Sequence, residues 1–373
     1  MGVALGLLLV ACGDGSDPEL GGPTDVDDAA SAEVAEESAS SASDEERASV
    51  VATTAILGDV LDNLLDGEAD VEVIIPPGAD PHGFEPSASD GQLLREADVV
   101  VANGLDLEEQ LLTALEAAEE EGVRVFTLAD KLDPIDFDWD GPGHDHADDD
   151  HADDDHADDD HAHEDDDHAD DDHAHEDDDH ADDDHAHELD PHVWFDPVRM
   201  ADGVALIAAE LAEHSDALDE DLLMSRAAAY GQQLEALDER ISGWFDTIPE
   251  GNRQLVTNHD ALGYFAARYD FEVVGTVLPG SSTQVEQDPA GFARLIESVE
   301  TAGVPAVFAE TTDSTVLAEQ LQSEVAARTD LDLEVVEIYT GALGEPGSGA
   351  ETYLGLLETT SALITEALGG RTG

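Results

Sequence analysis

The segment SVVATTAILGDVLDNLL, residues 49–65, sets the architecture of this chain. Residues 49–54 form a short apolar run with several β-branched side chains, which is typical of a buried strand. The apolar side chains of residues 55–65 then recur every three or four positions, which predicts an amphipathic helix directly behind the strand. A strand that passes straight into a helix is the repeating unit of a parallel α/β sheet.

The same alternation continues along the chain. Further strand patterns occupy residues 71–75, 98–103 and 123–128, and a second set occupies residues 254–258, 272–277, 306–310 and 333–339. Helical patterns separate these strands; one covers residues 107–122, one covers residues 197–214, and a long one runs from about 219 to 245. We therefore expect an α/β protein of two lobes, with parallel sheets covered by helices and one long bridging helix. Ligands bind such sheets at the carboxyl ends of the strands, so the cleft between the lobes is the expected site.

The expected domains follow this division. They are a lipoprotein signal in residues 1–12, a disordered acidic tether in 13–47, an N-terminal lobe in 48–218, a bridging helix in 219–247 and a C-terminal lobe in 248–373. A disordered insertion, residues 144–188, interrupts the N-terminal lobe.

The charge of the chain excludes some partners. Its 373 residues contain 93 Asp and Glu against 12 Lys and Arg, a formal net charge of −81. Such a surface repels phosphate backbones, so we expect no nucleic-acid binding and favour cations as partners. A single cysteine excludes a disulfide framework and a thiolate zinc finger.

The chain begins with VALGLLLV, residues 3–10, followed by Ala11, Cys12 and Gly13. A short apolar run that ends in small residues is typical of a signal peptide. LVAC, residues 9–12, resembles the lipobox of bacterial lipoproteins, although no Lys or Arg precedes the apolar run. The resemblance implies cleavage before Cys12, a lipid on its thiol and a protein anchored outside the cytoplasmic membrane. The alternative is a buried strand with an incidental cysteine.

Residues 144–188 form a ribbon of HADDD and HAHEDDD repeats that holds 12 of the 16 histidines. Its like charges and few apolar side chains predict disorder. Closely spaced imidazoles can still bind metal weakly, so we interpret the ribbon as a low-affinity zinc collector; the alternative is a solvated acidic insert. The histidines of the ribbon are His144, His146, His151, His156, His161, His163, His168, His173, His175, His180, His185 and His187.

Four histidines lie outside the ribbon. We interpret His214, near the end of a helical pattern, as a solvated residue favoured by the helix dipole. The others follow strand patterns or lie in loops: His82 in GADPHGFEPS, His192 in LDPHVWFDP and His259 in TNHDALGYFA. One loop histidine is usually incidental, but three at such junctions favour a shared ligand set.

These three segments, in this order, resemble the metal-binding lipoproteins that supply bacterial ABC importers of zinc and manganese. The resemblance runs from about residue 48 to the end, with the ribbon as an insertion. It implies a metal site between the lobes made by His82, His192 and His259, and a long helix that limits hinge closure. It also implies an ABC permease and its ATPase as partners.

The ligand types favour Zn²⁺ as cargo over Mn²⁺, because three imidazoles suit zinc and manganese prefers oxygen donors. Manganese-type relatives usually carry a carboxylate where this chain has His259. Tetrahedral zinc needs a fourth donor. Relatives often supply an Asp where this chain has Gly341, so the candidates are water, Glu310, Asp313 and Glu85. Imidazole must be neutral to bind, so we expect affinity to fall below about pH 6.5.

The sequence therefore predicts a monomeric extracytoplasmic subunit that captures zinc for a metal importer. Two other readings are a cell-surface metal buffer or adhesin, and a zinc hydrolase, since three histidines and a water also form a catalytic arrangement. The chain has neither an HExxH nor a Gly-x-Ser-x-Gly motif, which counts against an enzyme.

Overall fold

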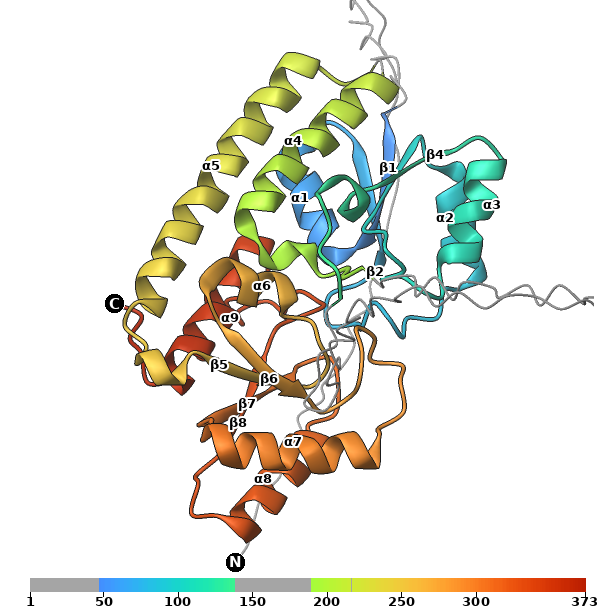
Figure 1. Cartoon of the computed structure of the whole chain (residues 1–373). Helices are drawn as coiled ribbons and strands as arrows, with labels where there is room; N and C mark the ends of the chain where they lie inside the picture. Colours follow the sequence, from blue (N-terminus) through green and yellow to red (C-terminus); the bar gives the residue numbers. More distant parts are fainter. Residues whose placement is uncertain (1–46, 138–188, 216) are drawn as a thin grey trace, which may run out of the picture. The chain divides into compact units, whose positions relative to one another are not determined.

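The computed structural model describes residues 47–137, 189–215 and 217–373. These residues belong to one compact unit that contains two four-stranded sheets, and every strand pair in both sheets is parallel. Figure 1 shows the two sheets in separate lobes, the first in blue to green and the second in orange. The predicted two-lobed α/β fold is confirmed.

The sheet of the N-terminal lobe has the strand order β2-β1-β3-β4. Its strands are β1 (Ser49–Thr54), β2 (Asp70–Ile75), β3 (Val99–Ala102) and β4 (Arg124–Thr127). Helices α1 (Ala55–Leu65) and α4 (Pro197–His214) pack on one face, and α2 (Ala88–Glu96) and α3 (Leu112–Glu120) pack on the other. Alternate residues of β1 serve the two faces, Val50 with the first helix pair and Val51 with the second, as the period of a strand requires.

The sheet of the C-terminal lobe has the order β6-β5-β7-β8. Its strands are β5 (Gln254–Thr257), β6 (Glu272–Thr276), β7 (Ala306–Glu310) and β8 (Glu334–Ile338). Helices α7 (Pro289–Ala302) and α8 (Val316–Arg328) cover one face, while α6 (Gly263–Tyr269) and α9 (Tyr353–Ala367) lie toward the other. The register between β5 and β6 shifts once, between Leu255 and Val256.

Local sequence explains where the helices begin. Thr54 ends β1 and caps α1, because its hydroxyl accepts a hydrogen bond from the backbone N–H of Leu57. Asp196 caps α4 in the same way, and Pro197 occupies the first turn, where its missing N–H costs nothing. Such a cap stabilises a helix by about 1 kcal/mol.

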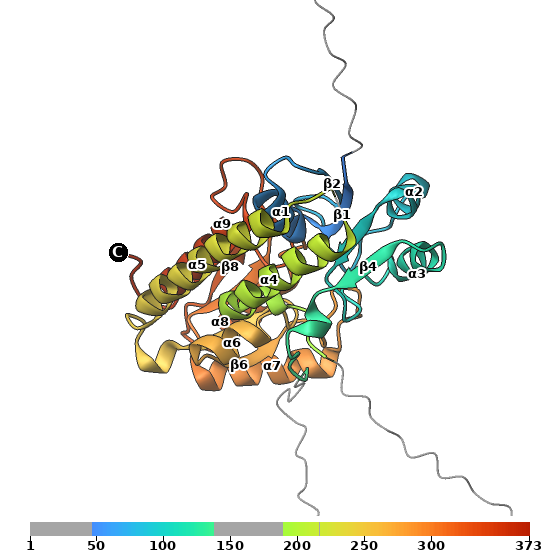
Figure 2. The same ribbon diagram turned by 90° about the horizontal axis from the view of Figure 1, so that it is seen from above.

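Helix α5 (Glu220–Phe245) is the long helix that the sequence predicts between the lobes. Its buried residues recur every three or four positions from Leu223 to Phe245, so one stripe faces the protein along the whole helix. The helix packs on α1 and α4 of one lobe and on α9 of the other (Figure 2). A single hydrophobic core follows this helix and includes Val50 of β1 and Phe308 of β7. This shared core ties the lobes together and leaves little freedom for a wide hinge motion.

One predicted helix is shorter than its sequence pattern. The pattern 107–122 predicts a helix from Leu107, but α3 begins only at Leu112. The carboxylate of Glu108 is buried and accepts hydrogen bonds from Thr53 Oγ1 and from the N–H groups of Asn103 and Gly104. These contacts hold residues 105–111 in turns, with positive φ at Leu105 and Asp106.

Within the described ranges, no helix is both long and apolar enough to cross a membrane.

Candidate metal centre

The structure brings the three predicted ligands together at one point. His82 lies in the loop after β2, His259 directly follows β5, and His192 precedes the short helix Val193–Phe195. Nε2 of His192 lies 3.3 Å from Nε2 of His82 and 3.3 Å from Nε2 of His259. Donors about 2.0–2.1 Å from a tetrahedral zinc stand roughly 3.3–3.4 Å apart, so the spacing of the triad fits zinc.

The repeated Asp-Pro-His sequence shapes two of the ligand loops. The carboxylate of Asp80 accepts a hydrogen bond from the backbone N–H of His82 at 3.0 Å, and Asp190 accepts one from the N–H of His192 at 2.9 Å. An Asp that binds the N–H two residues ahead forms a tight Asx-turn, and the proline between them has no N–H to satisfy. The motif therefore fixes the backbone from which each imidazole projects.

Carboxylates orient two of the three rings from behind. Nδ1 of His192 lies 2.8 Å from Oδ1 of Asp190, and Nδ1 of His259 contacts Oε1 of Glu310. The other oxygen of Glu310 accepts a hydrogen bond from Thr340 Oγ1 at 2.5 Å. Metal-binding histidines commonly donate their second ring N–H to a carboxylate, which fixes the tautomer and leaves Nε2 free to bind.

Burial and neighbouring charges set the protonation of the triad. Burial, together with His192 and His259, lowers the pKa of His82 to about 2. Burial also lowers the pKa of His192 well below 6.5. Burial alone would lower the pKa of His259, but the adjacent Glu310 carboxylate outweighs burial and raises it. Burial raises the pKa of Glu310, yet His259 reverses the effect and lowers it. Two rings thus stay neutral, while the third, beside Glu310, keeps a proton up to a higher pH than a free imidazole.

None of the three side chains predicted as a possible fourth ligand joins the cluster of histidines. Both oxygens of Glu310 are engaged, and the carboxylate of Asp313 accepts hydrogen bonds from Asn258 Nδ2 at 2.5 Å and from the N–H of Ser314 at 2.6 Å. Glu85 is exposed. Among the described residues, the possible ligand atoms that cluster at this point come from His82, His192 and His259 alone.

Gly341, the position at which the resemblance implied an Asp, lies against the loop that carries His82. A Cβ added at Gly341 would stand 2.9 Å from Cδ of Pro81, the residue before His82. The His82 loop therefore packs directly on the backbone of Gly341. In this chain the final loop supports a ligand loop, and it has no side chain there to offer the metal.

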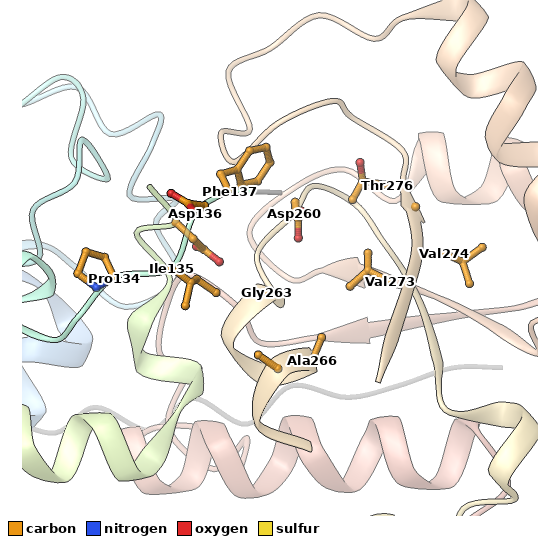
Figure 3. A pocket seen from close by; sticks show the side chains of 13 residues that line it. Pro134, Ile135, Asp136, Phe137, Asp260, Gly263, Ala266, Val273, Val274 and Thr276 are labelled. Carbon is orange, nitrogen blue, oxygen red and sulfur yellow. The ribbon is translucent and has the colours of Figure 1, made fainter. Parts of the chain in front are cut away.

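Two cavities flank the triad. One, of about 580 Å³, reaches His82 and is lined by Asp106 and Glu109 from one lobe and Ser282 from the other. The second, of about 630 Å³, lies between residues 134–137 and the segment from Asp260 to Thr276. Figure 3 shows Asp136 and Phe137 on one side of it, Val273 and Thr276 on the other, and Asp260 between them.

The residues on either side of the ribbon meet beside the second cavity. Asp136 pairs with Leu189 in an isolated antiparallel bridge, and the N–H of Asp190 donates to the carbonyl of Ile135 at 3.0 Å. Because Asp190 also holds His192, the base of the ribbon is attached to a ligand loop.

Several predicted features lie outside the described residues: Cys12, the tether apart from its last residue, Arg47, and the twelve ribbon histidines. His214 is described, and it lies at the end of α4 with Nδ1 3.2 Å from Glu210. Glu210 also pairs with Arg124, which already compensates its charge.

With this geometry in view, comparison with known proteins identifies the family. The family described as zinc-uptake complex component A, periplasmic, matches residues 50–367. The chain belongs to this family. Its members include metal-binding subunits of ABC transporters, which carry a solute rather than convert one, and this chain is a metal-binding subunit of that kind.

Two relatives show the range of metals in the zinc-uptake component A family. The manganese-binding lipoprotein MntA of Halalkalibacterium halodurans is 29% identical over 315 residues, which are 84% of this chain and 86% of that protein. The zinc-binding protein TroA of Treponema pallidum is 26% identical over 319 residues, 86% of this chain and 88% of that protein. The solved structure of TroA superposes with a TM-score of 0.68 at 25% identity, covering 86% of this chain and 99% of that one.

The sequence singled out the three histidines that the structure brings together, but not the groups behind their rings. Asp190 could have been found, since it occupies the same place before His192 as Asp80 does before His82. Thr340 and the supporting position of Glu310 could not, because they depend on β7 and β8 lying next to one another.

Proposed function

We propose that this chain is the extracytoplasmic zinc-binding subunit of a metal ABC importer, which captures Zn²⁺ and delivers it to a membrane permease. One observation carries the proposal: the three buried side chains that converge are all imidazoles, and Nε2 of His192 lies 3.3 Å from Nε2 of each of the other two. Imidazole suits zinc, whereas manganese prefers carboxylate and carbonyl oxygens.

Capture uses the protonation pattern of the triad. His82 and His192 are neutral because burial disfavours their charged forms. His259 loses the proton on Nε2 when zinc arrives, and Glu310 keeps the opposite ring nitrogen bound and compensates the charge of the ion. The lobes shield the triad from most of the bulk solvent, since its residues are only 1–3% exposed.

Release follows from docking on the permease and its ATPase partner. Beside the site the lobes also meet through hydrogen bonds, in addition to the apolar core that they share. Asp80 accepts from Thr283 at 2.5 Å, and Trp194 donates to the carbonyl of Thr340 at 2.9 Å. A small separation of the lobes would move His259 away from His82 and His192 and weaken the site.

We propose a solvent molecule as the fourth ligand. Glu310 and Asp313 are engaged elsewhere, Glu85 is exposed and Gly341 has no side chain. The cavity that reaches His82 gives water access to the metal.

The remaining sequence predictions complete the proposal. Cys12 carries the lipid, residues 13–47 tether the folded part, and the ribbon 144–188 raises the local concentration of zinc next to His192. The lobe boundaries are 48–218 and 248–373, with residues 219–247 as the bridge. The protein acts as a monomer.

Calorimetry tests the proposal. The protein without residues 144–188 is titrated with Zn²⁺ and, separately, with Mn²⁺, and His259→Ala is the control. We expect one tight zinc per chain, manganese binding at least tenfold weaker, and loss of the tight site in the control. Equal affinity for the two metals would contradict the zinc assignment.

A further inference from the structure

The ring of His82 differs from the other two rings of the triad. Its side chain is only 4% exposed, and its Nδ1 is buried without a hydrogen-bond partner among the described residues. A buried polar atom without a hydrogen-bond partner destabilises the folded protein. Asp190 and Glu310 meet this need for His192 and His259, so the third ligand lacks a support that the other two have.

One carboxylate faces the free nitrogen. Oε1 of Glu109 lies 3.9 Å from Nδ1 of His82, which is too far for a hydrogen bond. Glu109 follows β3 and lines the cavity that reaches His82, and its side chain is 35% exposed, so it has room to move. A shift of about 1 Å would bring the two atoms to hydrogen-bond distance.

The same oxygen also contacts the other lobe. Oγ of Ser282, in the loop between β6 and α7, donates to Oε1 of Glu109 at 2.6 Å. Glu109 therefore stands between a metal ligand of the N-terminal lobe and a hydroxyl of the C-terminal lobe.

We propose that Glu109 is the positioning residue for His82: when a metal binds Nε2, the N–H on Nδ1 donates to Oε1 of Glu109. A neutral imidazole that binds through Nε2 carries its proton on Nδ1, so metal binding creates the donor that this carboxylate accepts. Each ligand of the triad then has one carboxylate behind it. Because Ser282 holds the same oxygen, the arrangement also links metal binding to the contact between the lobes. The inference rests on the proposed function for the metal at Nε2.

The experiment uses the full chain and measures zinc affinity at the tight site by competition with a chelator. Glu109→Ala should weaken zinc binding about 10–100-fold, the usual effect of removing such a partner. Glu109→Gln, whose amide oxygen can still accept, should recover most of the loss. Asp106→Asn removes a negative charge from the same cavity without touching His82, and it should leave affinity within about twofold.

A spectroscopic signal separates positioning from a general structural effect. In long-range ¹H–¹⁵N spectra of the zinc-loaded protein, the Nδ1–H of His82, assigned with His82→Ala, should be visible and protected from exchange. In Glu109→Ala that resonance should broaden or vanish, while the corresponding signals of His192 and His259 remain. Thermal unfolding of the metal-free variants should match that of the original chain.

Four results would overturn the inference: unchanged affinity in Glu109→Ala, an unchanged His82 resonance, no recovery in Glu109→Gln, or an equal loss in Asp106→Asn. Failure of the proposed function is distinguishable, because the unaltered chain would then lack a tight zinc site altogether.

Discussion

The carboxylate of Glu310 contacts Nδ1 of His259 on the side of the ring opposite Nε2, the atom that faces the triad. Glu310 ends β7 and His259 follows β5, and these strands are neighbours at the centre of the sheet. Because β5 and β7 are neighbours, Glu310 lies directly behind the His259 ring and can orient it.

Glu310→Gln should lower zinc affinity about 10–100-fold, because the amide neither compensates the charge of the metal nor holds the ring as firmly. Competition with a chelator of known affinity measures the change. Asp313→Asn, three residues away and outside the triad, is the matched control and should bind zinc normally. A larger loss in Asp313→Asn than in Glu310→Gln would assign the fourth ligand to Asp313 instead.

Zinc affinity should rise with pH and then level off, and the midpoint should lie above 6.5. Glu310 outweighs the burial of His259 and raises its pKa, so zinc must displace a proton from this ring up to that higher pH. His82 and His192 have lowered pKa values and are already neutral there. Below the midpoint, affinity should fall about tenfold per pH unit, the slope for one proton.

Isothermal titrations between pH 5.5 and 8, in two buffers of different ionisation enthalpy, count the protons that are released when zinc binds. We expect one proton, from His259. Release of three protons, or an affinity independent of pH, would contradict the protonation pattern of the triad. Glu310→Gln should move the midpoint to lower pH, since it removes the group that raises the pKa of His259.

Gly341→Ala should disturb the His82 loop. The added Cβ would stand 2.9 Å from Cδ of Pro81, so the loop must shift, at a cost of about 1–3 kcal/mol in the free energy of unfolding or in zinc binding. Thermal unfolding with and without zinc distinguishes the two. Gly243→Ala, in α5 with open space around it, is the control and should be neutral or slightly stabilising. Equal behaviour of the two variants would show that the contact with Pro81 is unimportant.

The fold was predictable because local patterns and tertiary packing agree. The strand and helix expected in residues 49–65 have the bounds that the structure gives, since Thr54 both ends the strand and caps the helix. The helix expected from Leu107 was wrong at its start. The buried Glu108 accepts hydrogen bonds from the nearby Asn103 and Gly104 and also from Thr53, 55 positions away, a contact that no local pattern reveals.

The sequence pointed to the three histidines that converge, but not to the groups behind their rings. His82, His192 and His259 stand out because each has a distinctive loop sequence. Glu310 was predicted only as a possible ligand and Glu109 was not predicted at all, because a carboxylate in a helical or strand pattern looks like any solvated charge until the tertiary structure places it behind a ring. The pairing of Glu109 with Ser282 joins residues 173 positions apart, which no spacing rule could suggest.

X-ray absorption at the zinc edge shows directly whether three imidazoles hold the metal. Protein lacking residues 144–188 is loaded with one equivalent of Zn²⁺ and compared with His259→Ala. We expect three imidazole nitrogens and one oxygen at about 2.0–2.1 Å, with one imidazole fewer in the variant. A spectrum with two imidazoles and several carboxylate oxygens, unchanged in His259→Ala, would contradict this expectation.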